Sequence, residues 1–207
     1  VGKWHIGNTP AQAGFDYYSI FHGNGAYYHR EIEEPDTTFL MQEYIEKFIA
    51  GKGIFFIEQV AKNKPFFLFY CTQVPHMNHR FDWEVKNETL QYYRERIRHL
   101  PASWNDDMSG KPAYLIDGRN RKKAIDDYHY DVPDSVIMHI CKYYAVVSEM
   151  DTELGRFLDK IYSSGLDKNT YIFFMGDNGW FLGEHKFTSK VLAYEESVRV
   201  PCVVSGP

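Results

Sequence analysis

Residues 170–190 read "TYIFFMGDNGWFLGEHKFTSK", and this stretch decides the fold. Its first part, through Met175, is apolar without alternation, which is typical of a strand covered on both faces of a parallel sheet. An acid, an amide, glycines, a histidine and two lysines follow within 15 residues. Because open α/β sheets bind ligands at the carboxyl ends of their strands, the residues after Met175 are a candidate site.

Two further apolar runs extend this sheet in the prediction. The run "PFFLFYC" at 65–71 predicts another buried central strand, and "RVPCVVSG" at 199–206 predicts a third. Between the runs at 65–71 and 170–175, the apolar positions from Ser135 to about Ser163 keep the spacing of a long helix, which Gly165 would end. Strand, helix and strand in this order predict an α/β fold with a right-handed crossover, in which helices sandwich a largely parallel sheet.

The remaining segments predict one helix and one long insertion. Residues 37–50 have helical spacing, with Thr37 or Thr38 as a cap and Gly51 as a stop. Residues 80–134 are polar, aromatic and irregular, and we interpret them as an insertion that is partly helical near 86–99. We read the basic clusters in it as solvated surface. Residues 1–207 are then one partial domain that contains this insertion.

The composition excludes several classes of protein. At 207 residues with 44% hydrophobic residues, the chain is long enough for one globular core. A net charge of −5 gives no global attraction to nucleic acid, and no apolar segment approaches the roughly 20 residues that span a bilayer. The three cysteines are widely spaced among apolar neighbours, which predicts buried thiols rather than a disulfide framework or a zinc site.

Asp177 and Asn178 are the candidate metal ligands. They follow the predicted strand directly, between Gly176 and Gly179, and supply the hard oxygen atoms that Ca²⁺ or Mg²⁺ prefers. Two residues do not fill a shell of roughly six to eight oxygens, so a metal needs further ligands. The alternative is an Asx turn at the end of the strand, which the "DNG" sequence alone favours.

Four basic residues are the candidate anion ligands and proton carriers. Lys3 and His5 are two residues apart, so in an extended segment both would project to one side. His76 follows the predicted strand at 65–71 after a short turn, and we prefer it as a single proton donor or hydrogen-bond partner over a transition-metal pair with His79. Lys190 adds a second ammonium group. For each of them, an ordinary surface residue is the alternative.

The predicted topology brings these residues together. Both buried strands end in polar groups, and the fold rule places those ends at one edge of the sheet. A pocket with two lysines, two histidines and a hard cation suits a tetrahedral oxyanion.

Four ordered motifs resemble the type I sulfatases of the alkaline phosphatase superfamily. They are "GKWHIG", "PFFLFYCTQVPH", "YYAVVSEMDTELGRFLDKI" and "GDNGWFLGEHKFTSKVLAYEESVRVPCVVSGP". The similarity runs from residue 2 to residue 207, interrupted at 80–134, and its last block is the most specific. Four motifs in order are much harder to obtain by chance than one.

The resemblance implies a role for each candidate residue. Lys3 would contact the sulfate and His5 the hydroxyl of the nucleophile. His76 and Lys190 would hold the sulfate and help to protonate the leaving oxygen. His185 of "GEH" would organise the substrate pocket or its loop. Asp177 and Asn178 would ligate Ca²⁺.

The chain departs from the family pattern at the nucleophile. The family uses a formylglycine made from the Cys or Ser of a C/S-x-P/A-x-R signature, and none of Cys71, Cys141, Cys202 or the serines begins one. In relatives that signature and further metal-binding aspartates precede "GKWH", so we expect the chain to be a part of the catalytic domain downstream of them, inactive alone and with exposed apolar edges.

The sequence therefore predicts a piece of a sulfuric ester hydrolase that acts on a sulfated carbohydrate or a small sulfated molecule. Two alternatives remain open, namely a phosphodiester or phosphonate-ester hydrolase of the same superfamily and a non-catalytic homologue that binds sulfated glycans. The resemblance implies a secreted, periplasmic or lysosomal protein without choosing among them.

Overall fold

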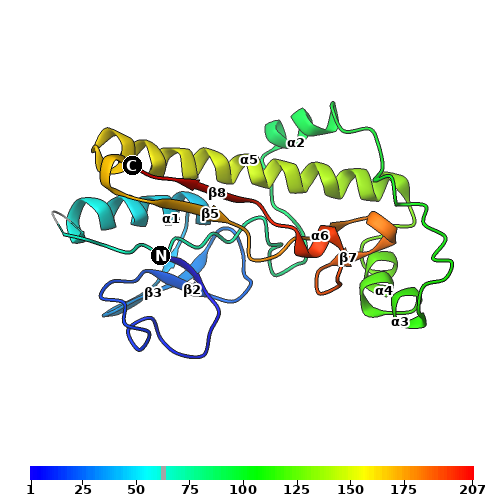
Figure 1. Cartoon of the computed structure of the whole chain (residues 1–207), viewed down its shortest axis with the longest axis horizontal. Coiled ribbons are helices and arrows are strands. Elements are labelled where there is room, and N and C mark those ends of the chain that lie inside the picture. Colours follow the sequence, from blue (N-terminus) through cyan, green and yellow to red (C-terminus); the bar gives the residue numbers. More distant parts are fainter. Residues whose placement is uncertain (62–63) are drawn as a thin grey trace. The chain divides into compact units, whose positions relative to one another are not determined.

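The computed structural model describes residues 1–61 and 64–207 (Figure 1). The chain divides into two compact units. Unit 1 comprises residues 1–89 and 145–167, and unit 2 comprises residues 90–144 and 168–207. Along the described chain, four strands precede a run of helices that ends with α5 (Pro133–Ser163), and the remaining strands follow it.

Unit 1 contains a four-stranded sheet in the order β1-β2-β3-β4, followed by a helix. Its elements are β1 (Gly2–Trp4), β2 (Ile20–His22), β3 (Arg30–Glu34), β4 (Thr37–Met41), α1 (Ile45–Phe55) and the π-helical turn η1 (Phe56–Val60). The β1–β2 pair is parallel, whereas β2–β3 and β3–β4 are antiparallel.

Unit 2 contains short helices and two small antiparallel sheets, β5-β8 and β6-β7. Its elements are α3 (Ala113–Ile116), α4 (Arg119–Asp126), β5 (Ile172–Met175), β6 (Phe181–Leu182), η3 (Glu184–Lys186), β7 (Thr188–Ser189), α6 (Glu195–Val198) and β8 (Cys202–Ser205). Three elements have residues in both units. They are α2 (Asn87–Arg94), α5 (Pro133–Ser163) and the 3₁₀ turn η2 (Leu166–Asn169).

The helix predicted at 135–163 is confirmed as α5, and the helical segment near 86–99 as α2. Gly165 follows α5 with φ +72°, a conformation that glycine adopts without steric cost, as predicted for the stop. Although α5 has 31 residues, none of the described helices is apolar enough over a sufficient length to cross a membrane.

The helix predicted at 37–50 is wrong in its first half. Residues 37–41 form β4, which pairs with β3 across a turn at Pro35 and Asp36, so neither Thr37 nor Thr38 caps a helix. β-branched and aromatic residues favour a strand when a partner strand is available, and this tertiary pairing overrides the apparent helical spacing. The helix begins at Ile45 and continues through Gly51.

The predicted central strand at 65–71 is present only as extended chain. Its one ladder contact is a parallel bridge between Cys71 and Gly2, with Lys3 N donating to Cys71 O at 2.9 Å. The prediction that both faces are covered is wrong for this chain, since Phe67 is 73% and Phe69 48% exposed. Gly2 has φ +96°, and a Cβ there would lie 1.9 Å from Cys71 O, so only glycine fits the bridge.

The strands predicted at 170–175 and 199–206 are confirmed as β5 and β8, but they too are exposed. They pair with each other in antiparallel register, from Ile172 opposite Ser205 to Met175 opposite Cys202. A largely parallel sheet is thus not seen among the described strands. The predicted crossover from 65–71 to 170–175 joins segments of different units and stays a prediction.

The cysteine prediction is partly confirmed. All three cysteines are free thiols, as expected without a disulfide framework, and Cys141 is buried. Cys71 is only half-buried and Cys202 is exposed, because the segments that carry them are themselves uncovered. Residues 80–134 hold α2, α3 and α4 among irregular segments, and their origin as an insertion stays a prediction.

Candidate functional site

The structure brings two of the predicted residues, Asn178 and Lys190, into direct contact in unit 2. Lys190 Nζ donates a hydrogen bond to Asn178 Oδ1 at 2.9 Å. Asn178 Nδ2 donates to Gly179 O at 2.8 Å. The carboxamide oxygen thus bonds an ammonium group and not the backbone that an Asx turn would use. A cation therefore lies directly beside the candidate metal ligands.

The loop at 176–179 fits closely against α6, and this packing fixes its course. Gly179 N donates to Ser197 O at 2.8 Å, and a Cβ at Gly179 would lie 2.1 Å from Glu196 O. Asp177, between the two glycines, is exposed. The glycines of "GDNG" therefore allow a close approach of two backbones while Asp177 stays accessible.

The backbone of Lys190 is held by Asn120 of α4, a residue that no sequence motif predicted for the site. Asn120 Nδ2 donates to Thr188 O at 2.7 Å and to Lys190 O at 2.8 Å. Ser189 and Val191, on either side of Lys190, have φ of +70° and +75°. Non-glycine residues in this region are strained, and such strain persists only where surrounding contacts enforce it. Nothing local in the sequence connects positions 120 and 190.

His185 belongs to a second polar group in unit 2, which we call the His185 cluster: Asp106, Lys111, His185 and Tyr194. His185 Nδ1 lies 2.5 Å from Asp106 Oδ2, and Lys111 Nζ forms a salt bridge with the same carboxylate oxygen. Lys111 Nζ also lies 3.4 Å from Tyr194 OH, and the rings of His185 and Tyr194 are 5.0 Å apart. Of these four residues, only His185 stands in a motif that predicts a functional role.

Hydrogen bonds within the His185 cluster favour the charged forms of Asp106 and Lys111. The bond from Lys111, with further bonds from Met108 N and His185, holds the pKa of Asp106 well below its usual range. The same bond to Asp106 raises the pKa of Lys111. Since an ionised carboxylate only accepts, Nδ1 of His185 carries the proton that points to Asp106. In the neutral ring Nε2 then has the lone pair and can accept a hydrogen bond.

The cluster rests on an apolar base. Met108, Leu115, Phe181 and Phe187 are buried and pack together, with Tyr194 partly buried against them. Glu184 accepts a hydrogen bond from Leu182 N at 2.7 Å, and burial raises its pKa. His185 itself has φ +54°, and its N–H donates to Ser103 O at 3.0 Å. The "GEH" loop is therefore held from both its backbone and its side chains.

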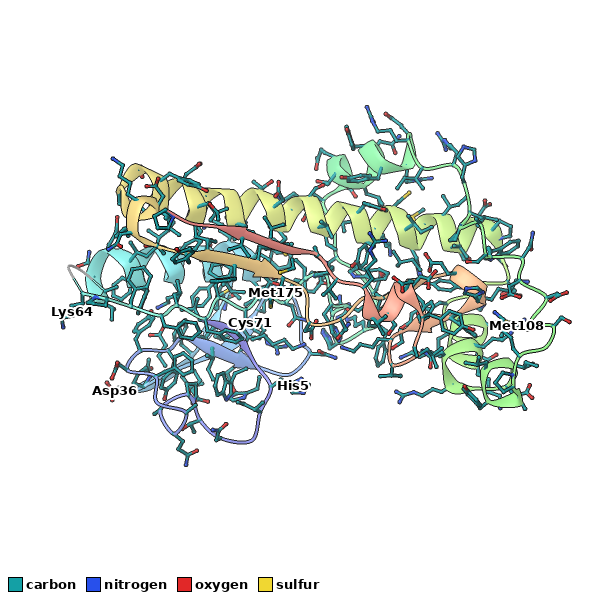
Figure 2. All side chains as sticks on the ribbon, in the orientation of Figure 1. His5, Asp36, Lys64, Cys71, Met108 and Met175 are labelled. Atoms are coloured by element: carbon teal, nitrogen blue, oxygen red, sulfur yellow. The ribbon has the colours of Figure 1, made fainter. Side chains whose placement is uncertain are left out.

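Lys3, His5 and His76 lie in unit 1. Lys3 is in β1 and donates from Nζ to Asn24 Oδ1 at 2.9 Å, whereas His5 follows the end of β1 and is exposed. His76 is half-buried, and its Nδ1 lies 2.9 Å from Met77 O. Figure 2 draws the side chains of the described residues, with His5 labelled. The predicted convergence of these residues with Asn178 and Lys190 stays a prediction.

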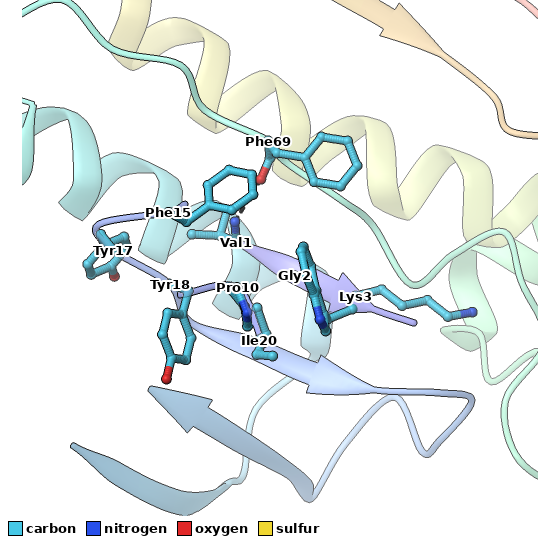
Figure 3. Close-up of a pocket in the computed structure, with 10 residues that line it drawn as sticks. Val1, Gly2, Lys3, Pro10, Phe15, Tyr17, Tyr18, Ile20 and Phe69 are labelled. Atoms are coloured by element: carbon cyan, nitrogen blue, oxygen red, sulfur yellow. Dashed lines mark hydrogen bonds between the residues drawn. The ribbon is translucent and has the colours of Figure 1, made fainter. Parts of the chain in front are cut away.

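A small pocket next to Lys3 offers no chemistry of its own. Figure 3 shows its lining residues, and the Lys3 side chain extends away from the aromatic ones. Its walls are mainly apolar, with aromatic side chains from Trp4, Phe15, Tyr17 and Phe69. We therefore do not place the anion site there.

Asp177 and Asn178 are the right kind of ligand for a hard cation, but they are too few to bind one alone. Asp177 and Asn178 offer carboxylate and carboxamide oxygens, the ligands that Ca²⁺ prefers. No group of three or more His, Cys, Asp or Glu side chains that could hold a metal occurs among residues 1–61 and 64–207. Two residues supply only part of the roughly six to eight oxygens that Ca²⁺ takes.

Comparisons with known proteins agree on one family. A family model described as Sulfatase matches residues 1–207. The chain is 25% identical to N-acetylglucosamine-6-O-sulfatase of Bacteroides thetaiotaomicron, covering 100% of this chain and 46% of that protein. It is 25% identical to an arylsulfatase of Klebsiella aerogenes, covering 86% of this chain and 44% of that protein.

A solved structure shares the fold. It is described as a complex with its substrate D-glucosamine-2-N,6-O-disulfate, and it matches with a TM-score of 0.81 and 25% identity. The match covers 100% of this chain and 52% of that one. The chain thus spans about half the length of these relatives, and the α/β class predicted from the sequence is confirmed.

Proposed function

The chain belongs to the sulfatase family, and we propose that it supplies part of the active site of a sulfuric ester hydrolase. The single observation that carries this proposal is the hydrogen bond from Lys190 to Asn178. It places an ammonium group beside hard oxygen ligands, the combination that binds and polarises a tetrahedral oxyanion. The relatives that the chain resembles along its full length support the same reaction class.

In this proposal Lys190 neutralises charge on the sulfate. Lys190 is half-buried, so its attraction for an anion is less screened than that of a fully exposed lysine. Asn120 of α4 fixes the backbone on which the ammonium group depends. Asp177 and Asn178 would hold a Ca²⁺ together with ligands from outside these residues, and the ion would add Lewis-acid stabilisation of the sulfate oxygens.

Lys3, His5 and His76 take the roles that the family resemblance implies. Lys3 contacts the sulfate, His5 the hydroxyl of the nucleophile, and His76 donates a proton to the leaving oxygen or hydrogen-bonds to it. A bond from Nδ1–H to the carbonyl of Met77 assigns this work to Nε2, and the ring performs it as the imidazolium, because only that form has a second N–H to donate. No cysteine or serine of this chain fits the formylglycine signature, so we derive no covalent step from its residues.

We further propose that the substrate is a sulfated carbohydrate and that the His185 cluster binds its hydroxyl groups. Neighbouring donors and acceptors above an aromatic ring suit the alternating hydroxyl and C–H faces of a sugar. The cluster offers an ammonium group, a carboxylate, an imidazole and the Tyr194 ring within a few ångströms. Two relatives with names that refer to sulfated glucosamine support this substrate class.

The test is a substitution series in the full-length protein, assayed with N-acetylglucosamine-6-sulfate, an aryl sulfate and an aryl phosphate. We expect Lys190→Ala to lower kcat/KM for both sulfates by about 10²- to 10³-fold, the loss typical of one preorganised donor. Lys186→Ala is the matched control, since this lysine lies in η3, four residues before Lys190, and is placed over the Trp104 ring. It should stay close to wild type.

Three results would overturn the proposal. Equal losses in the two variants would mean that Lys190 has no special part in the site. Faster turnover of the aryl phosphate than of either sulfate ester would instead support the first alternative, a phosphodiester or phosphonate-ester hydrolase. Binding of sulfated glycans without turnover by the wild-type protein would support the non-catalytic homologue.

A further inference from the structure

The loop that carries His76 is capped by a buried carboxylate from α1. Glu46 Oε1 accepts hydrogen bonds from Gln73 N at 2.7 Å and from Val74 N at 2.9 Å. Glu46 is only 1% exposed, and Gln73 only 2%. Burying an acid is costly unless it forms hydrogen bonds, so this carboxylate has a specific task at residues 73–74.

Two more side chains bond the same loop from other parts of unit 1. Tyr27 OH donates to His76 O at 2.7 Å, and Trp83 Nε1 donates to Pro75 O at 2.8 Å. Both side chains are fully buried. Between Gln73 and His76, the main chain is thus bonded by three buried side chains that come from separate segments of the sequence.

The fixed main chain determines how the imidazole of His76 is presented. Its Nδ1 lies 2.9 Å from Met77 O, and a carbonyl oxygen accepts only, so Nδ1 carries the proton. The neutral ring then has its lone pair on Nε2, so Nε2 is the atom that takes up the proton which His76 passes to the leaving oxygen in the proposed function. A loop free to rotate would lose this Nδ1 contact, because the donor and acceptor belong to adjacent residues whose relative orientation depends on the backbone.

We infer that Glu46 is a positioning residue for His76, which acts by holding the backbone at 73–74 so that His76 presents Nε2. The inference rests on the role of His76 in the proposed function. It goes beyond that role because it assigns a task to a residue of α1 that has no contact with the imidazole among the hydrogen bonds described here. A plain structural cap is the alternative, and it predicts no effect on the tautomer.

The surroundings of Glu46 are consistent with a fixed cap. Its second oxygen, Oε2, is buried and has no hydrogen-bond partner among the described residues, and the same is true of Gln73 Oε1. The titratable groups that influence it are Glu153 of α5 and the phenols of Tyr27, Tyr44 and Tyr70. None of these is a cation, so no residue in the part of the chain that the structure describes holds Glu46 in a salt bridge.

The experiment measures the tautomer of His76 in the full-length protein by ¹⁵N NMR of labelled histidines, at a pH where the ring is neutral. We expect the Nδ1–H tautomer in the wild type and in Glu46→Gln, whose amide oxygen still accepts both N–H groups. In Glu46→Leu we expect a shift toward the Nε2–H tautomer, with a loss of about 10- to 100-fold in kcat/KM from misplacement of the group.

Glu149→Gln is the matched control. Glu149 is a buried acid of the same unit that accepts a hydrogen bond from Lys86 N at 2.9 Å, and its carboxylate is not among the groups that bond the backbone at 73–76. It should leave the tautomer unchanged. If Glu46→Leu does not fold, Tyr27→Phe replaces it, because this change deletes only the donor to His76 O and should move the tautomer in the same direction.

The outcomes separate the two claims. A folded Glu46→Leu, or failing that Tyr27→Phe, that keeps the wild-type tautomer would overturn the positioning role. If His76→Ala retains full activity while Glu46→Leu shifts the tautomer, then the proposed catalytic role of His76 fails but the positioning of its ring by Glu46 stands.

Discussion

Glu46 shows how one buried residue couples stability to pH. Burial raises the pKa of Glu46 to about 7 from its ordinary value of 4.5, although the backbone bonds from Val74 and Gln73 oppose the rise. The folded protein therefore retains a proton that the unfolded chain has already lost across this pH range. The contribution of Glu46 to stability is fully present below pH 4.5 and is lost as the pH rises through about 7.

We predict that Glu46→Gln flattens this dependence. The wild type should lose about 3 kcal/mol of unfolding free energy between the two pKa values, by the conversion of roughly 1.4 kcal/mol per unit. The amide has no proton to lose there, so the variant should keep its stability. Urea unfolding at several pH values measures the difference, and parallel slopes for the two proteins would contradict it.

At the residue scale the sequence predicted the chemical groups better than their partners. Asn178 and Lys190 were both identified, because each stands in a motif that follows an apolar run. Asp106 and Asn120 were not, although they bond residues at the site, since 79 positions separate Asp106 from His185 and 68 separate Asn120 from Thr188. Such pairs have no local signal, because only the folded chain brings them together.

Helix α4 is the element that holds the segment leading out of β7. The amide of Asn120 donates to two carbonyl oxygens at once, so its loss leaves two acceptors without their donor. We predict that Asn120→Ala lowers the free energy of unfolding by about 1–3 kcal/mol. Asn120→Asp should cost more, because a carboxylate would face both carbonyl oxygens. Urea unfolding measures both variants.

Asp126→Asn is the control for that comparison, as it changes an exposed residue of the same helix. Its unfolding free energy should match that of the wild type within a few tenths of a kcal/mol. If Asn120→Asp proves as stable as Asn120→Ala, the two bonds to the β7 segment do not have the importance that we assign them.

At the element scale, long periodic segments were predicted well and short ones poorly. The apolar positions of α5 repeat with helical spacing over its 31 residues. A pattern of this length does not fit a short strand, so no strand pairing competes with the helix. At residues 37–50 the pattern covered barely four turns, and pairing with β3 took the first five residues. The apolar run at 65–71 identified an extended segment but not its exposure, which depends on what lies against it.

For the whole molecule, the apolar surface of β5 and β8 dominates the expected behaviour in solution. Phe173 is 65% exposed and lies opposite Val204, which is 53% exposed, while Met175 and Val203 are 61% and 60% exposed. A two-stranded sheet is marginal by itself in water, and a contiguous apolar patch favours association. Residues 1–207 prepared alone should therefore self-associate.

We predict that replacing the facing pair, by Phe173→Thr together with Val204→Thr, reduces this association. Threonine retains strand propensity, so the sheet should persist while its apolar area falls. Analytical ultracentrifugation over a range of concentrations measures the effect. Leu40→Thr, at a 58% exposed position of β4, is the control and should change little. A double variant that associates as strongly as the parent would place the contact elsewhere.

The bridge between Gly2 and Cys71 has a consequence for how mutational scans of the "GKW" segment should be interpreted. A scan would find position 2 as intolerant as position 3, yet the two constraints differ in kind. One comes from the space between two main chains, where even a methyl group collides with Cys71 O, and the other from the charge that we assign to Lys3. Intolerance to substitution therefore does not by itself identify a chemical role in this segment.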